Sequence, residues 1–179
     1  MIKRFVSIPA AVLTAMLLAS AAHAQQDVPL PLETVLNFQR VGDRLASSGQ
    51  IGLDQISLIK DEGYEVVINL AVADPRNEGE GFAVAEAGLT YVHIPVVWET
   101  PTVSDVEMFL DVMQANRNRK VYVHCIANMR ASAFMYMYRT LIEGVPEPEA
   151  RATMNAVWDP DDREQWGDLV RQVMSEPRR

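Results

Sequence analysis

The sequence predicts an α/β fold in which a mostly parallel central sheet is flanked by helices. Short runs rich in valine and isoleucine alternate with longer segments whose apolar residues recur at helical spacing. This alternation of strand and helix is typical of βαβ units and of a parallel sheet covered on both faces. Neither an internal repeat nor a linker interrupts the order, so we expect residues 25–179 to form a single domain.

The first predicted elements are a short strand and a helix. Residues 44–49 have the pattern of a strand, and residues 50–62 follow it as a helix. Apolar side chains recur at three-residue intervals from Leu53 to Ile59, which places them on one helical face. Gly63 can adopt the left-handed conformation that ends many helices.

Two apolar strands follow, separated by a polar loop and a short helix. Residues 64–70 and 89–97 are rich in valine and isoleucine and are predicted to be buried strands. Between them, residues 74–81 are predicted to form a polar loop. Residues 82–87 are then predicted to form a short helix that ends at Gly88.

The second half of the chain continues the alternation. Ser104 is predicted to cap a helix that runs to about Asn116, because acidic residues follow it in the first turn. Residues 120–124 are predicted to form another apolar strand, and Cys125 lies in the loop after it. The remaining predicted helices cover residues 130–143, 147–157 and 161–174.

Residues 1–24 have the pattern of a secretory signal peptide. Lys3 and Arg4 precede an apolar run at residues 11–21, and Ala-His-Ala at residues 22–24 is a small-x-small cleavage pattern. The apolar run is shorter than the about 20 residues that a membrane-spanning helix requires. We therefore expect the mature protein to be periplasmic or secreted, with no stable membrane insertion after signal cleavage.

Composition narrows the range of partners. The chain has 24 acidic and 16 basic residues and a formal net charge of −8. An acidic protein is a poor match for the anionic backbone of nucleic acids or for an anionic lipid surface. The single cysteine and three histidines show no spacing typical of a metal site. We therefore expect no nucleic-acid partner, no metal and no cofactor.

The single cysteine, Cys125, lies where a predicted strand leads into a helix. The N–H groups of such a loop and of the first helical turn form an anion-binding nest. The positive end of the helix dipole favours the thiolate, which is a strong nucleophile. Arg130, at the far end of the loop, can offer two parallel N–H donors to a tetrahedral oxyanion. Together these groups suit attack on a phosphoryl or sulfuryl group.

The segment around Cys125 resembles the signature loop of cysteine-dependent protein-tyrosine phosphatases, and most closely that of the dual-specificity-like branch. The resemblance rests on His124, Cys125, Arg130 and Ser132, which follow a Val-Tyr-Val strand. It covers residues 44–143. Three further segments resemble the first strands of such domains: residues 45–50, 66–70 and 91–96.

The resemblance implies a phosphatase-like fold that hydrolyses phosphomonoesters through a phosphocysteine intermediate, without a metal. Cys125 is then the nucleophile and Arg130 the phosphate clamp, while Ser132 assists release of the thiolate and His124 holds the loop. The expected partner is a phosphorylated or other anionic substrate, either a phosphoprotein or a small molecule. The residues expected to contact it are His124, Ile126, Ala127, Asn128, Met129 and Ser132.

The loop departs from the family pattern in its length. Four residues separate Cys125 from Arg130, whereas the family has five, and Asn128 stands where a glycine is usual. Asparagine tolerates the left-handed conformation better than most residues. A loop of this length also resembles that of rhodanese-like sulfurtransferases, whose cysteine carries a persulfide. Two alternatives therefore stay open: a sulfurtransferase, and a non-catalytic pseudophosphatase that binds an anion.

A phosphatase also needs an acid that protonates the leaving oxygen. The family places an aspartate in the loop that follows the strand at residues 91–96, and here that loop contains Glu99 and Asp105. Glu99 is the first candidate because it follows Trp98, whose ring can exclude water from the carboxyl group. Asp105 is the second, although an acid in a first helical turn also complements the helix dipole.

Overall fold

The computed structural model describes residues 31–175, which contain a five-stranded sheet in the order β1-β2-β5-β3-β4. The first pair in this order is antiparallel and the other three are parallel. The predicted α/β class with a mostly parallel sheet is therefore confirmed. The strands are β1 (Gln39–Val41), β2 (Leu45–Ser48), β3 (Val66–Asn69), β4 (Thr90–His93) and β5 (Val121–His124).

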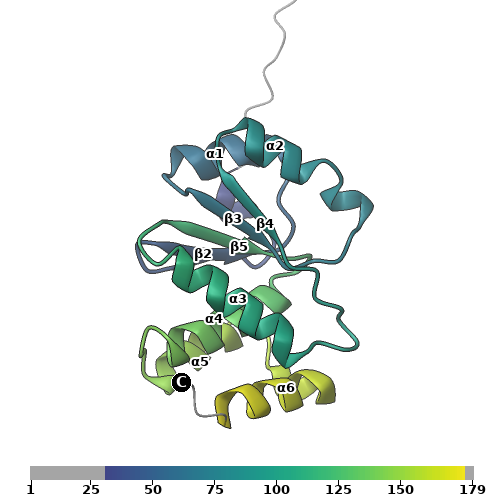
Figure 1. Cartoon of the computed structure of the whole chain (residues 1–179), viewed down its shortest axis with the longest axis vertical. Coiled ribbons are helices and arrows are strands. Elements are labelled where there is room, and N and C mark those ends of the chain that lie inside the picture. The colour runs from purple at the N-terminus through teal and green to yellow at the C-terminus, as the bar shows by residue number, and fades with distance from the viewer. Residues whose placement is uncertain (1–30, 176–179) are drawn as a thin grey trace, which may run out of the picture.

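Helices cover both faces of this sheet. The α-helices of the described chain are α1 (Ile56–Asp61), α2 (Glu80–Glu86), α3 (Val103–Ala115), α4 (Met129–Leu141), α5 (Glu147–Asn155) and α6 (Glu164–Ser175). Short 3-10 turns are η1 (Leu32–Thr34), η2 (Leu53–Gln55), η3 (Pro75–Asn77) and η4 (Pro160–Asp162). Figure 1 shows α1 and α2 on one face of the sheet and α3 to α6 on the other.

The central strand β5 is buried on both faces. Val121 and Val123 belong to the apolar cluster that contains Phe134 of α4. Tyr122, between them, joins the opposite cluster, where its ring packs edge-on against Tyr64 at 5.3 Å. Because both faces are covered, the strand shows a continuous apolar run rather than the alternation of a half-exposed strand.

Helix α3 begins earlier than predicted. Its N-cap is Thr102 and not Ser104: the Asp105 N–H donates to the Thr102 hydroxyl at 3.2 Å, and the Thr102 N–H donates to the Asp105 carboxylate at 2.9 Å. Both residues are good caps, and both are followed three positions later by an acid. Pro101 disfavours a helical conformation only at Thr100, so the chain enters the helix at the first capping residue after the proline.

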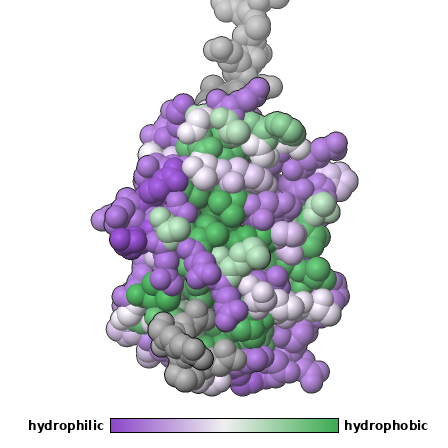
Figure 2. Space-filling view, in the orientation of Figure 1, coloured by the Kyte–Doolittle hydropathy of each residue, from purple (hydrophilic) through white to green (hydrophobic). Residues whose placement is uncertain are grey.

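Strand β4 is shorter than predicted and forms an edge of the sheet. The buried strand predicted at residues 89–97 is ordered as a strand only over Thr90–His93, and His93 is exposed. An edge strand has one neighbour, so part of its apolar surface stays uncovered. Figure 2 shows apolar residues gathered in the middle of the molecule, where β4 reaches the surface between the two helical layers.

The beginning of the described chain is packed rather than free. Leu32, in η1, is only 1% exposed and joins the cluster on the α1 side of the sheet. The predicted signal peptide at residues 1–24 lies outside the described residues. Between residues 31 and 175, no helix has both the length and the apolar character of a membrane span.

Candidate active site

Cys125 follows β5 directly, at the carboxyl edge of the parallel strands where such sheets bind ligands. Its N–H donates to the carbonyl oxygen of Ser48 in β2 at 3.2 Å, and the residue is fully buried. It is the single cysteine of the chain and is not in a disulfide. β5 therefore holds the thiol at the point where the chain turns into α4.

Asn128 shapes that turn. It is the N-cap of α4 and has φ 63° and ψ −2°, in the left-handed region. The Ser132 N–H donates to the Asn128 carbonyl at 2.8 Å, so the N–H groups of the helix before Ser132 have no intrahelical partner. They belong to residues 129–131, four to six positions after Cys125, and are of the kind that the predicted anion nest requires.

A segment next to β1 braces this loop. The side-chain amide of Asn128 donates to the Asn37 carbonyl at 2.6 Å, and the side-chain amide of Asn37 donates to the Ala127 carbonyl at 3.0 Å. Gly49 approaches the loop so closely that a Cβ there would lie 2.9 Å from the Ile126 carbonyl oxygen. The loop is thus fixed from the side of β1 and β2.

Arg130 lies in the first turn of α4, and its guanidinium contacts the loop after β4. Its Nε donates to the Val96 carbonyl at 2.9 Å, and its guanidinium carbon lies 5.4 Å from the centre of the Trp98 ring. Its two terminal nitrogens make no hydrogen bond within residues 31–175, so they are available to an oxyanion. The structure therefore brings the predicted clamp against the loop that carries Glu99, the first of the two predicted acids.

The three tryptophans of the chain pack together against this loop. The ring centre of Trp98 lies 5.3 Å from that of Trp158 and 5.0 Å from that of Trp166. The Trp166 Nε1–H donates to the Trp98 carbonyl at 3.0 Å, and the Trp158 Nε1–H donates to the Met129 carbonyl at 2.9 Å. The C-terminal segment therefore holds both the loop after β4 and the first turn of α4.

The ring of His124 contacts a carboxylate that the sequence does not single out. Its Nε2 lies 2.9 Å from Oε1 of Glu80, and both side chains are fully buried. Burial by itself raises the pKa of Glu80, but hydrogen bonds from His124, Gln50 and Tyr91 outweigh burial and hold the pKa below its ordinary value. Glu80 lies in a segment predicted as a polar loop, where acids are normally solvated, so no pattern marked it.

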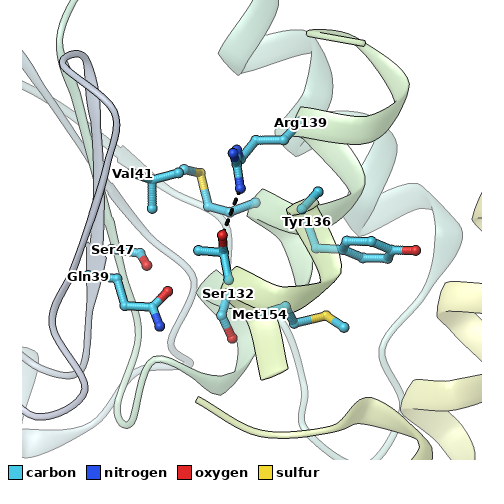
Figure 3. Close-up of a pocket in the computed structure, with 10 residues that line it drawn as sticks. Gln39, Val41, Ser47, Ser132, Tyr136, Arg139 and Met154 are labelled. Atoms are coloured by element: carbon cyan, nitrogen blue, oxygen red, sulfur yellow. Dashed lines mark hydrogen bonds between the residues drawn. The ribbon is translucent and has the colours of Figure 1, made fainter. Parts of the chain in front are cut away.

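Ser132 is bound within α4 and lines a small cavity. Its hydroxyl donates to the Met129 carbonyl at 3.1 Å. The cavity lies between β1 and β2 on one side and α4 and α5 on the other (Figure 3), and its volume is about 10 Å³. This is room for one water at most, so the cavity is not a substrate pocket. Ser47, which also lines it, has a buried hydroxyl without a hydrogen-bond partner among the described residues.

The two candidate acids lie in different environments. Glu99 is exposed in a turn directly after Trp98, so the expectation that the Trp98 ring excludes water from it is wrong; its carboxylate makes no hydrogen bond or ion pair within the described chain. Asp105 belongs to the capping box of α3, where its carboxylate also accepts a hydrogen bond from the Thr102 hydroxyl at 2.8 Å. Among residues 31–175, no group of three or more histidine, cysteine, aspartate or glutamate side chains is placed to hold a metal ion.

The mostly parallel sheet, the buried cysteine before α4 and the arginine in its first turn are the arrangement expected of a cysteine-dependent phosphatase. Comparison with known proteins agrees with this class. Residues 37–166 match the family described as "DSP-PTPase phosphatase fused to NAD+ Kinase". The chain belongs to this family, and the resemblance to dual-specificity-like phosphatases is confirmed.

Solved structures are similar over most of the chain. A putative phosphatase (DUF442) from Shewanella putrefaciens is 36% identical, with a TM-score of 0.75 over 83% of this chain and 95% of that one. TpbA from P. aeruginosa is 22% identical, with a TM-score of 0.62 over 76% of this chain and 84% of that one, and shows the fold alone. Nothing in these comparisons supports a sulfurtransferase.

Curated relatives match a shorter part of the chain. The beta-lactamase hydrolase-like protein of Xylella fastidiosa is 32% identical over 109 residues, which are 58% of this chain and 25% of that protein. The protein of the same name from Agrobacterium fabrum is 28% identical over 110 residues. The chain thus spans about a quarter of the length of the curated relatives it matches.

Proposed function

We propose that this protein hydrolyses phosphomonoesters through a phosphocysteine intermediate formed on Cys125. One observation carries the proposal: Cys125 directly follows the buried strand β5, and a three-residue turn leads from it to the unpaired N–H groups of the first turn of α4. Arg130 lies in that same turn, with its terminal nitrogens unpaired within the described chain. A nucleophile is thus placed beside donors that suit a tetrahedral anion.

In the first step, the thiolate of Cys125 attacks phosphorus, and the S–P bond forms as the P–O bond to the leaving group breaks. The loop N–H groups and Arg130 stabilise the charge on the other phosphoryl oxygens. An acid gives its proton to the leaving oxygen. In the second step, water attacks phosphorus and gives its proton to the same carboxylate. The S–P bond then breaks and releases phosphate and the thiolate, with Ser132 assisting the departing sulfur.

Glu99 is the acid that we propose. It follows Trp98, whose ring lies over the guanidinium of Arg130, so its backbone position is tied to the clamp. Its carboxylate is free of hydrogen bonds in the described chain, whereas the carboxylate of Asp105 caps α3. An acid must give up its proton during turnover, and a carboxylate engaged in a cap is less suited to this task.

The substrate is anionic, and we propose that it is an aryl phosphomonoester such as a phosphotyrosine side chain. TpbA from P. aeruginosa has been solved in complex with phosphotyrosine. That structure shares its fold with 76% of the present chain. A phosphoprotein and a small aryl phosphate offer the same reacting group, so a generic aryl phosphate serves as the first probe.

The test compares residues 25–179 with the same protein carrying Cys125→Ser, under reducing conditions. The wild-type protein should release phosphate from an aryl phosphate, and the variant should release none above background, because the chain has no other cysteine. Rapid acid quenching followed by mass spectrometry should detect the mass of one phosphate on the peptide with Cys125. Ser132→Ala should increase the trapped fraction, since it slows departure of the thiolate.

Other results would replace the proposal. Sulfur transfer from thiosulfate to cyanide by the wild-type protein, without phosphate release, would establish a sulfurtransferase. Binding of an aryl phosphate with equal affinity by the wild-type protein and Cys125→Ser, without turnover by either, would establish a pseudophosphatase.

Glu99→Gln and Asp105→Asn separate the two candidate acids. An alkyl leaving group needs protonation more than an aryl one does, so loss of the acid should slow alkyl phosphate hydrolysis selectively. We expect Glu99→Gln to reduce this turnover by about 10²–10⁴-fold. Asp105→Asn should instead lower the free energy of unfolding by about 1 kcal/mol, through the cap of α3. The reverse result would assign the acid to Asp105.

We also propose that the protein is exported to the periplasm, on the basis of Lys3, Arg4, the apolar run and the small-x-small pattern at residues 22–24. Fractionation of a producing bacterium followed by mass spectrometry of the intact protein tests this. A periplasmic protein that begins at Gln25 is the expected product. A cytoplasmic protein that retains residues 1–24 would contradict the proposal.

A further inference from the structure

Glu80 is a fully buried carboxylate at the start of α2, on the opposite side of the sheet from α4. Placing an ionised carboxylate in a protein interior is costly unless several donors satisfy it. The burial of Glu80 therefore depends on its hydrogen-bond partners, and two of these partners lie close to Cys125 in the chain.

Three donors converge on Glu80, each from a different segment. His124 ends β5 and lies 2.9 Å away; Gln50, after β2, donates through its side-chain amide at 2.6 Å; Asn69, at the end of β3, donates at 3.1 Å. The Asn69 amide also donates to the hydroxyl of Tyr91 in β4 at 3.1 Å, so Tyr91 adjoins the carboxylate. One side chain thus joins three adjoining segments at the carboxyl edge of the sheet.

Two of these partners lead directly to the reactive loop. His124 is the residue before Cys125. Gln50, whose side chain binds Glu80, uses its backbone N–H to hold the Ile126 carbonyl at 3.1 Å, one residue beyond Cys125. The carboxylate is therefore connected to the chain on both sides of the nucleophile.

The contact also determines where the proton sits on the imidazole. A carboxylate only accepts hydrogen bonds, so the Nε2 of His124 must carry the hydrogen that Glu80 receives. The other ring nitrogen, Nδ1, is buried and has no partner among the described residues. No other described contact therefore orients this ring through its nitrogens, and Glu80 alone fixes its tautomer.

We propose that Glu80 is a positioning residue for the nucleophile: through His124 and Gln50 it holds the Cys125 loop in the shape that stabilises the thiolate. The proposal rests on the assignment of Cys125 as nucleophile, but its test uses thiol alkylation and does not require phosphatase turnover. The titratable groups that face Glu80 are His124 and Tyr91; Gln50 and Asn69 are neutral.

The first measurement is the rate at which iodoacetamide alkylates Cys125, as a function of pH, in residues 25–179. Glu80→Gln should shift the midpoint of this profile to higher pH, because a loosened loop stabilises the thiolate less. Glu86→Gln, an exposed change on the same helix, is the matched control and should leave the profile unchanged. An unchanged midpoint in Glu80→Gln would overturn the proposal. So would a shift to lower pH, since it would mean that Glu80 acts only as a negative charge opposing the thiolate.

The second measurement is the ¹⁵N spectrum of the histidine rings. Residues 25–179 contain only His93 and His124, and His93→Gln assigns the two signals. His124 should show its proton on Nε2 in the wild-type protein and in Glu86→Gln, and a mixture of tautomers in Glu80→Gln. A wild-type ring protonated only on Nδ1 would contradict the proposal.

A third measurement tests whether the hydrogen bonds of Glu80 affect turnover. Once hydrolysis of an aryl phosphate is established, Glu80→Gln should lower kcat/KM by about ten- to a hundredfold, as expected when a reacting group is displaced on the order of 1 Å. If Glu80→Gln does not fold, Tyr91→Phe removes a hydroxyl that adjoins the same carboxylate and binds Asn69, and should move the Nε2–H signal of His124. A signal that does not move in Tyr91→Phe would count against the network.

Discussion

Asn128 has a backbone conformation that is unfavourable for most residues. Its φ of 63° lies in the left-handed region, which costs an L-residue such as alanine roughly 1–2 kcal/mol. Its side chain also donates to the Asn37 carbonyl, a contact that contributes about 1 kcal/mol. We therefore expect Asn128→Ala to lower the free energy of unfolding by about 2–3 kcal/mol in urea denaturation, and to lower phosphatase activity.

Asn128→Gly is the control for the free-energy cost of the left-handed backbone conformation. Glycine adopts positive φ without penalty, so this variant loses the contact with Asn37 but keeps the turn into α4. It should be more stable than Asn128→Ala by about 1 kcal/mol. Equal stability of the two variants would show that the side-chain contact, and not the left-handed turn, makes asparagine valuable here.

Residue-level prediction from the sequence succeeded where chemistry depends on adjacent residues. Cys125 and Arg130 share one loop, so their spacing is visible in the sequence, and the structure places them as expected at the strand-to-helix turn. Their roles stay predictions. Glu80 could not be found this way, because its partners are 11 to 44 residues distant and meet only when the sheet forms.

At the level of elements, the loop after β4 is held by the C-terminal helix α6. Trp166 donates its Nε1–H to the Trp98 carbonyl, and Trp98 in turn lies over Arg130. Trp166→Phe keeps an aromatic ring but removes this donor. We expect it to lower the free energy of unfolding by about 1–3 kcal/mol, and also to lower kcat/KM because the loop that bears Glu99 is less fixed.

Val173→Ala is the matched control for α6. Val173 is fully buried on the same helix, and its truncation should cost about as much stability through lost packing. It leaves the hydrogen bond to Trp98 intact, so kcat/KM should stay near the wild-type value. Equal losses of activity in both variants would show that α6 contributes only to general stability.

Element boundaries show what local patterns miss. The strands and helices around Cys125 were predicted because each has an apolar run or a helical period. β1 (Gln39–Val41) was not predicted, because three residues are too few to show alternation. The edge position of β4 was also hidden, since an apolar run looks alike in a central strand and in an edge strand that packs on a neighbouring helix.

For the whole molecule, the ionisation of tyrosine gives a prediction about pH. Burial raises the pKa of all five tyrosines above their ordinary value of 10. The unfolded chain therefore releases these protons at lower pH than the folded chain does. Folding stability is then fully present below pH of about 10 and declines as the pH rises above it. Urea denaturation between pH of about 8 and 11 measures this decline.

Tyr122→Phe tests the origin of the alkaline decline. Tyr122 is buried in the sheet and its hydroxyl donates to Ser48 at 2.8 Å, so the variant loses some stability at every pH. It also has one tyrosine fewer to ionise. Above pH of about 10 its stability should therefore fall less steeply than that of the wild-type protein, by up to about 1.4 kcal/mol per pH unit. Parallel curves would assign the decline to other groups.

The fold class could be predicted from the sequence because it depends on the order of strands and helices, which a single chain displays. The positions of Trp158 and Trp166 against Trp98 could not, since tertiary packing over some 60 residues determines them. The Cys125 loop can be recognised in the sequence, but the residues that hold it and the loop after β4, such as Trp158 and Trp166, come from distant parts of the chain.

The gathering of all three tryptophans at one place has an optical consequence. Every indole of the chain lies within this one cluster, which touches Arg130 through Trp98 and the start of α4 through Trp158. The tryptophan fluorescence of the protein, excited selectively over that of tyrosine, therefore originates beside the proposed phosphate site. Titration with a non-hydrolysable oxyanion should change this emission, which gives a label-free signal for ligand occupancy even in variants that have lost turnover.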